Sequence, residues 1–139
     1  MSSKTFLLLG IAAVFGIASC NTPDKLLCRT WQPTFVDFDE TKLYYDPAMK
    51  AGIVAQLKDT ILFVFNKDHT YSVRMPDRTE RGTWRFSTKC DTIYTNYENS
   101  GAFSKVNSLT KEFLNVETYD KNGMEMKFIL RPLTVKPQL

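Results

Sequence analysis

The sequence predicts an all-β domain in which an antiparallel meander of about eight strands closes into a barrel. Short segments rich in β-branched and aromatic residues recur along the chain, and turn residues separate them at even spacing. Several of these segments alternate apolar and polar residues with a period of two, which indicates strands with one buried face. Evenly spaced short strands are typical of an up-and-down barrel, and a two-sheet sandwich is the alternative.

The expected strands begin with 31–38 and end with 124–130. In "MEMKFIL" at 124–130, apolar side chains alternate with Glu125 and Lys127. The last hairpin is "DKNG", and its Gly123 can adopt the positive φ that such a turn needs. The other expected strands are 60–65, 71–75, 83–87, 91–97, 102–109 and 113–119.

One segment between the first two strands has helical character. Asp46 can cap the N-terminus of a helix at about 46–58, and Pro47 suits the first helical position. Its apolar residues fall at helical spacing: Met49, Ile53, Val54 and Leu57. We interpret it as a lid packed on a barrel end, with a partner-binding helix as the alternative. A shorter helix within 23–31 is expected to lead into the first strand.

An uncharged apolar segment, "FLLLGIAAVFGIA", follows Lys4 and spans residues 6–18. It matches the apolar region of a secretory signal peptide and is shorter than the roughly 20 residues that cross a membrane. Ile17, Ala18 and Ser19 then precede Cys20. This order resembles the lipobox of bacterial lipoproteins. An ordinary secreted protein or an uncleaved anchor is the alternative.

The lipoprotein resemblance implies that Cys20 becomes the first residue and carries acyl chains such as palmitate. Residues 1–19 are then a signal peptide, 20–25 a lipidated tether and 26–139 the barrel domain. We expect a cell-envelope protein held at a membrane through its lipid. Asn21 after the cysteine, in place of Asp, favours the outer membrane.

The charges and cysteines of the mature chain exclude several classes of function. Removing 1–19 leaves 17 of the 18 basic side chains and all 15 acidic ones, which is too balanced for a nucleic-acid-binding surface.

Cys28 and Cys90 remain as an even pair, and we expect either a disulfide between them or two separate thiols. His69 is the only histidine, so we expect no metal site. No cofactor is expected either.

The sequence also lacks signs of catalysis. It has no nucleophile beside a base and no glycine-rich phosphate loop, and its acidic residues are scattered over turns and outer faces. We therefore expect no catalytic residues and no enzyme activity.

Three segments in order resemble the lipocalin-like lipoproteins of Gram-negative envelopes. They are "LLCRTWQ" at 26–32, "FNKDHTYSV" at 65–73 followed by "RGTWRFS" at 81–87, and "SLTKEFLNVE" at 108–117. His69 stands where the family pattern has glycine in the first hairpin. Histidine tolerates a left-handed backbone better than most residues, so we expect the turn to form.

This resemblance implies a barrel that binds a small apolar molecule or lipid. An eight-stranded barrel has room for its own side chains or for one small ligand. The bulky inward residues predict a filled or nearly filled barrel, and a small apolar cavity is the alternative. A non-catalytic assembly component that docks an envelope partner is the alternative function. The candidate interior residues are Phe63, Phe65, Tyr71, Val73, Trp84, Phe86, Met126 and Phe128.

Overall fold

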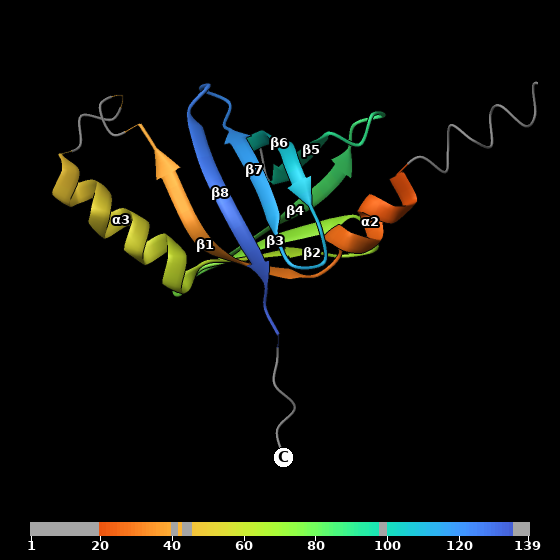
Figure 1. Cartoon of the computed structure of the whole chain (residues 1–139), viewed down its shortest axis with the longest axis horizontal. Coiled ribbons are helices and arrows are strands. Elements are labelled where there is room, and N and C mark those ends of the chain that lie inside the picture. The colour runs from red at the N-terminus through yellow and green to blue at the C-terminus, as the bar shows by residue number, and fades with distance from the viewer. Residues whose placement is uncertain (1–19, 40–41, 43–45, 98–99, 135–139) are drawn as a thin grey trace, which may run out of the picture.

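The protein folds into a closed barrel of eight antiparallel strands (Figure 1). This computed structural model describes residues 20–39, 42, 46–97 and 100–134, so the expected signal peptide lies outside the described residues. Each strand pairs with the next one along the chain, and β8 pairs with β1 to close the barrel. The predicted fold class is therefore confirmed, and the sandwich alternative is excluded.

The strands fall close to their expected positions. The largest difference is at β4, which begins at Thr79 because Thr79 and Glu80 pair with Arg74 and Val73 of β3. The strands are β1 (Thr30–Phe38), β2 (Leu62–Phe65), β3 (Thr70–Arg74), β4 (Thr79–Phe86), β5 (Thr92–Tyr97), β6 (Ser100–Leu109), β7 (Leu114–Tyr119) and β8 (Glu125–Pro132).

Helix α3 (Pro47–Thr60) is capped as predicted, since the Met49 amide donates to the Asp46 side chain at 2.8 Å. It packs on β1, on the opposite side of the molecule from α2 (Figure 1). Val54 and Leu57 contact the core, whereas Met49 is half exposed. No α3 side chain lines the barrel cavity, so the interpretation of α3 as a lid over the barrel interior is wrong. Among the described residues, no helix is long and apolar enough to span a membrane.

Helix α2 (Asn21–Leu27) lies at one end of the barrel and starts inside the stretch expected to be a tether. Its Leu27 is fully buried, as is Trp31 at the start of β1. The Trp31 Nε1 donates to the Leu27 carbonyl at 2.9 Å, which satisfies the buried indole. This contact closes the barrel at the end where α2 lies.

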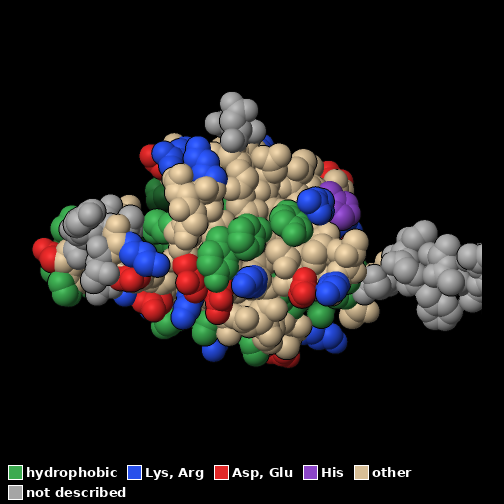
Figure 2. Space-filling model, turned by 90° about the horizontal axis from the view of Figure 1, so that it is seen from above, with side chains coloured by type: hydrophobic (Ala, Val, Ile, Leu, Met, Phe, Trp, Pro, Cys, Tyr) green, Lys and Arg blue, Asp and Glu red, His purple; other side chains and the backbone are tan. Residues whose placement is uncertain are grey.

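The hairpin between β2 and β3 completes the closed end. His69 adopts the predicted left-handed backbone, with φ 65°. Its exposed ring (purple in Figure 2) stacks on Trp84 with centroids 4.5 Å apart. The Trp84 Nε1 donates to the Asn66 carbonyl at 3.0 Å.

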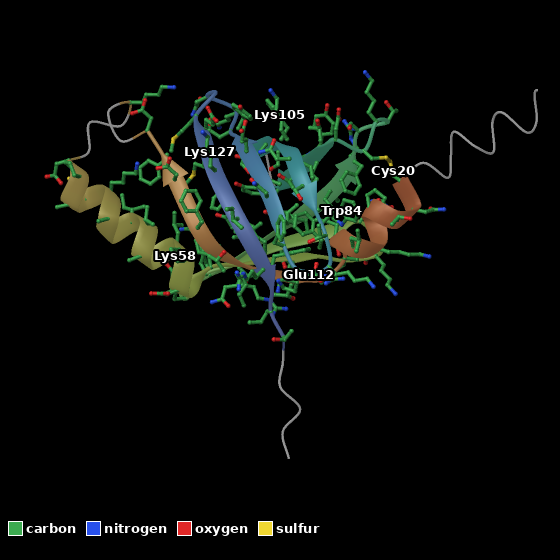
Figure 3. All side chains as sticks on the ribbon, viewed as in Figure 1. Cys20, Lys58, Trp84, Lys105, Glu112 and Lys127 are labelled. Carbon is green, nitrogen blue, oxygen red and sulfur yellow. A yellow bond between two sulfur atoms is a disulfide. The ribbon has the colours of Figure 1, made fainter. Side chains whose placement is uncertain are left out.

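The disulfide in the structure differs from the one expected. Cys90 is bonded to Cys20, with Cα atoms 5.7 Å apart, and Cys28 is a free thiol (Figure 3). Cys20 and Cys28 are the N-cap and C-cap residues of α2. Because a helix rises 1.5 Å per residue, the two cysteines lie about 12 Å apart along the helix axis. The β4–β5 turn meets the N-terminal end of that helix, so Cys20 is the residue within reach of Cys90. The predicted Cys28–Cys90 pairing is therefore wrong.

Candidate functional site

A cavity of about 510 Å³ occupies the interior of the barrel. Inward-facing residues of β2, β3 and β5 to β8 form its wall, because alternate residues of each strand point to the same side. Its apolar lining consists of Phe63, Phe65, Val73, Met75, Ile93, Ala102, Leu114, Val116, Met126, Phe128 and Leu130.

Six of the eight candidate interior residues line this cavity. They are Phe63, Phe65, Tyr71, Val73, Met126 and Phe128. Trp84 and Phe86 do not line it. Trp84 is 2% exposed and meets Phe65 and Phe86 edge to face, so it packs beneath the cavity at the closed end.

The cavity exists because one wall of the barrel carries small inward side chains. Thr95 on β5, Ala102 and Ser104 on β6 and Thr118 on β7 leave space that the bulky residues of β2 and β8 do not fill. The prediction of a filled barrel is therefore wrong. The sequence does contain evidence for a cavity in "SGAFSKV" at 100–106, where alternation places the small residues Ser100, Ala102 and Ser104 on one face. The Ser104 and Thr118 hydroxyls form a hydrogen bond with each other, with their oxygen atoms 2.8 Å apart.

The mouth of the cavity is polar and lies at the end opposite α2. It carries Arg78 and Glu80 from the start of β4, Tyr97 from the end of β5 and Asp120 after β7. The Arg78 Nε lies 3.5 Å from the Glu80 carboxylate. Because Arg78 is exposed, this ion pair contributes little to stability. The sequence analysis did not identify Glu80, Tyr97 and Asp120, because the candidate interior residues were chosen by apolar alternation.

Two tyrosine hydroxyls in the cavity stay protonated at neutral pH. Burial raises the pKa of Tyr71, and the nearby Tyr97 and Glu80 raise it further. Burial also raises the pKa of Tyr97, with smaller contributions from Glu80 and Asp120. Both side chains can therefore donate a hydrogen bond to a bound molecule.

The interior thus combines an apolar floor with a polar entrance, the usual character of a site for one small ligand. In the described part of the chain, no three His, Cys, Asp or Glu side chains gather where a metal ion could be held. No protein-family model matches the sequence, and no curated protein matches it. The closed eight-stranded antiparallel topology is consistent with a lipocalin-like fold.

Proposed function

We propose that this protein is a membrane-anchored, lipocalin-like barrel that binds a small apolar molecule or lipid in its interior. The observation that supports this most is the cavity of about 510 Å³, within the range typical of small-molecule sites. An apolar ligand body would replace water along the Phe63, Val116 and Phe128 side chains. A polar group on the ligand would stay at the mouth, near Tyr97 and Glu80.

The first experiment is native mass spectrometry of the protein purified from its source. We expect a mass increment that is lost on denaturation. N-phenyl-1-naphthylamine, an apolar dye whose fluorescence rises on burial, then gives a titration of the purified domain.

A pair of variants locates the dye. Ala102→Phe places a ring inside the barrel, and we expect it to weaken dye binding about tenfold. Thr79→Phe is the matched control, because Thr79 precedes the inward Glu80 on β4 and is exposed. Equal dye affinity in the two variants, with both folded, would contradict a ligand inside the barrel.

Membrane anchoring through Cys20 is the second part of the proposal, supported by the lipobox sequence. Transfer of a diacylglyceryl group to the Cys20 sulfur forms a thioether, so that sulfur cannot also form the disulfide with Cys90. We expect the mature native protein to carry a diacylglycerol mass on Cys20 and to have two free thiols, Cys28 and Cys90. An unmodified Cys20 in the native protein would contradict the anchor.

An assembly role is the alternative function, and the exposure of α3 is the observation that favours it. Met49 is 50% exposed, and no residue of α3 is buried. A protein that co-purifies with the native chain and is lost in Met49→Glu would support assembly. A small-molecule mass increment without such a partner would support ligand binding.

A further inference from the structure

An outward-facing row of side chains crosses the barrel from β4 to β7. Arg85 pairs across the strands with Tyr94, Tyr94 with Phe103, and Phe103 with Tyr119. Each of these residues alternates along its strand with a residue that faces the interior. We call Arg85, Tyr94, Phe103 and Tyr119 the aromatic row.

The aromatic row is accessible and has a basic side chain near each end, with Glu117 and Glu125 also beside Tyr119. The Arg85 guanidinium lies 4.2 Å from the Tyr94 ring centre, and the Lys105 Nζ lies 5.5 Å from that of Tyr119. Phe103 and Tyr119 stack with centroids 5.0 Å apart, and Tyr94 is 38% exposed. Figure 2 views the molecule from the side of Lys105, which is labelled at the top of Figure 3, and shows hydrophobic side chains in a row with both basic and acidic ones beside them.

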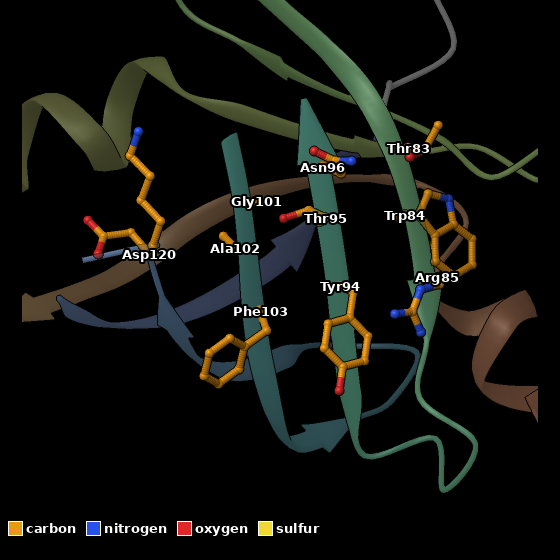
Figure 4. A pocket seen from close by; sticks show the side chains of 11 residues that line it. Thr83, Trp84, Arg85, Tyr94, Thr95, Asn96, Gly101, Ala102, Phe103 and Asp120 are labelled. Carbon is orange, nitrogen blue, oxygen red and sulfur yellow. The ribbon is translucent and has the colours of Figure 1, made fainter. Parts of the chain in front are cut away.

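A groove of about 510 Å³ runs beside the aromatic row (Figure 4). Its base is the next cross-strand row, in which Thr83 pairs with Asn96 and Asn96 with Gly101. These side chains are short or absent, so the rings of Tyr94 and Phe103 rise beside a shallow polar shelf. Lys121, from the turn after β7, also lines the groove.

The groove has unused cationic groups. In the described part of the chain, neither Arg85 nor Lys121 forms an ion pair with an acidic side chain. Arg85 keeps its guanidinium donors for a partner while its face rests on Tyr94. A guanidinium in this position suits a bidentate contact with a carboxylate or phosphate.

We propose that this groove binds a saccharide chain that carries anionic groups on some of its sugars. The C–H face of a sugar ring packs on the electron-rich faces of Tyr94 and Phe103. Sugar hydroxyls pair with the Asn96 amide and the Thr83 hydroxyl. An anionic group on a neighbouring sugar meets Arg85 and Lys121. This site lies on the outer face of the barrel, and it shares Asp120 with the mouth of the cavity.

The charges around the groove favour a sparsely charged glycan over a nucleic acid. Asp120 lines the groove, and Glu125 pairs with Tyr119 at the end of the aromatic row. These carboxylates repel a chain that carries a phosphate on every unit. A glycan with a charge on every second sugar can place its anionic groups at Arg85 and Lys121 alone.

The test measures binding of hyaluronan hexasaccharide, which has a carboxylate on alternate sugars, by calorimetry at low ionic strength. The comparison ligands are uncharged chitohexaose and hexathymidylate. We expect hyaluronan to bind most tightly of the three. Absence of hyaluronan binding, equal affinity for chitohexaose, or tighter binding of hexathymidylate would overturn the proposal.

Variants then assign the binding to the groove. We expect Tyr94→Ala and Gly101→Leu each to weaken hyaluronan binding about tenfold. Among the described residues, an added Cβ at Gly101 meets the Thr95 carbonyl oxygen alone, at 3.9 Å, so Gly101→Leu fills the groove without overlapping these strands. We expect Arg85→Gln to remove the preference for hyaluronan over chitohexaose.

A control separates this site from other aromatic surfaces. Phe35→Ala removes an aromatic side chain that is 47% exposed on β1, across the barrel from β5. We expect it to bind hyaluronan as the unaltered protein does, and a loss equal to that of Tyr94→Ala in the folded Phe35→Ala variant would overturn the assignment.

Discussion

Among the glycines in the described part of the chain, Gly82 on β4 has the least room for a side chain. A Cβ at this position would overlap the backbone of Asn96 and Tyr97 on β5. The overlap involves main-chain atoms, so a rotamer change cannot relieve it. The ladder between β4 and β5 ends at the pair Thr83 and Asn96, next to this close approach.

We therefore expect Gly82→Ala to lower the free energy of unfolding by about 3 kcal/mol. Gly52 in α3 is the matched control, because nothing lies within 4 Å of an added Cβ there. Gly52→Ala should raise the free energy of unfolding by about 0.5–1 kcal/mol through helix propensity. Urea denaturation of both variants measures the contrast, and a Gly82→Ala protein as stable as the parent would show that β5 can move away.

His69 combines a left-handed backbone with a ring that stacks on Trp84. His69→Ala and His69→Gly lose the same stacking, but alanine keeps the steric cost of positive φ and glycine does not. We expect the glycine variant to be more stable than the alanine variant by about 1 kcal/mol. Thermal unfolding compares the two, and an alanine variant of equal stability would mean that the turn has changed its conformation.

At the scale of the elements, α3 packs on β1, and Val54 and Leu57 contact the core. The Lys50 ammonium lies 2.7 Å from the Asp37 carboxylate on β1, and this hydrogen bond lowers the pKa of Asp37. A lowered carboxyl pKa stabilises the folded state above the ordinary pKa of about 3.9. That stability is lost as the pH falls through the lower, folded-state pKa.

We expect Asp37→Asn to cost a few tenths of a kcal/mol near pH 7, because the pair is half exposed. As the pH falls through the lowered folded-state pKa, the carboxyl becomes protonated in both states, so the difference from the parent should shrink toward zero. Urea titrations at pH 7 and at successively lower pH values give the comparison. A cost that does not change as the pH falls would assign the effect to packing instead of charge.

At the scale of the whole molecule, the Cys20–Cys90 disulfide closes a loop that contains β1 to β4. It joins residues 70 apart in sequence, so it restricts the unfolded chain strongly. For the unacylated, oxidised protein we expect Cys90→Ser to lower the free energy of unfolding by up to ~4 kcal/mol. Cys28→Ser should have a much smaller effect, because Cys28 is a free, half-buried thiol. Equal effects would show that the disulfide does not control stability.

The meander could be predicted from the sequence because each hairpin is local. Alternation in β3, β5 and β8, the Asp46 cap and the Gly123 turn each depend on residues close together in the chain. The cavity depends on side chains from opposite walls, so its volume follows from the small residues of β6 facing the large ones of β2. The disulfide partner depends on the direction of α2, which no local pattern gives. The aromatic row could not be predicted from the sequence, because it depends on which residues of neighbouring strands pair with one another.

The closed end and the mouth lie at opposite ends of the barrel, and Cys20 lies at the closed end beside α2. A chain tethered through Cys20 therefore stands with its sealed base on the bilayer and its entrance turned away from it. A bound molecule would leave into the aqueous compartment instead of returning directly to the membrane beneath. Under the proposed anchoring and ligand binding, this arrangement would suit hand-over to a soluble acceptor or to a facing surface.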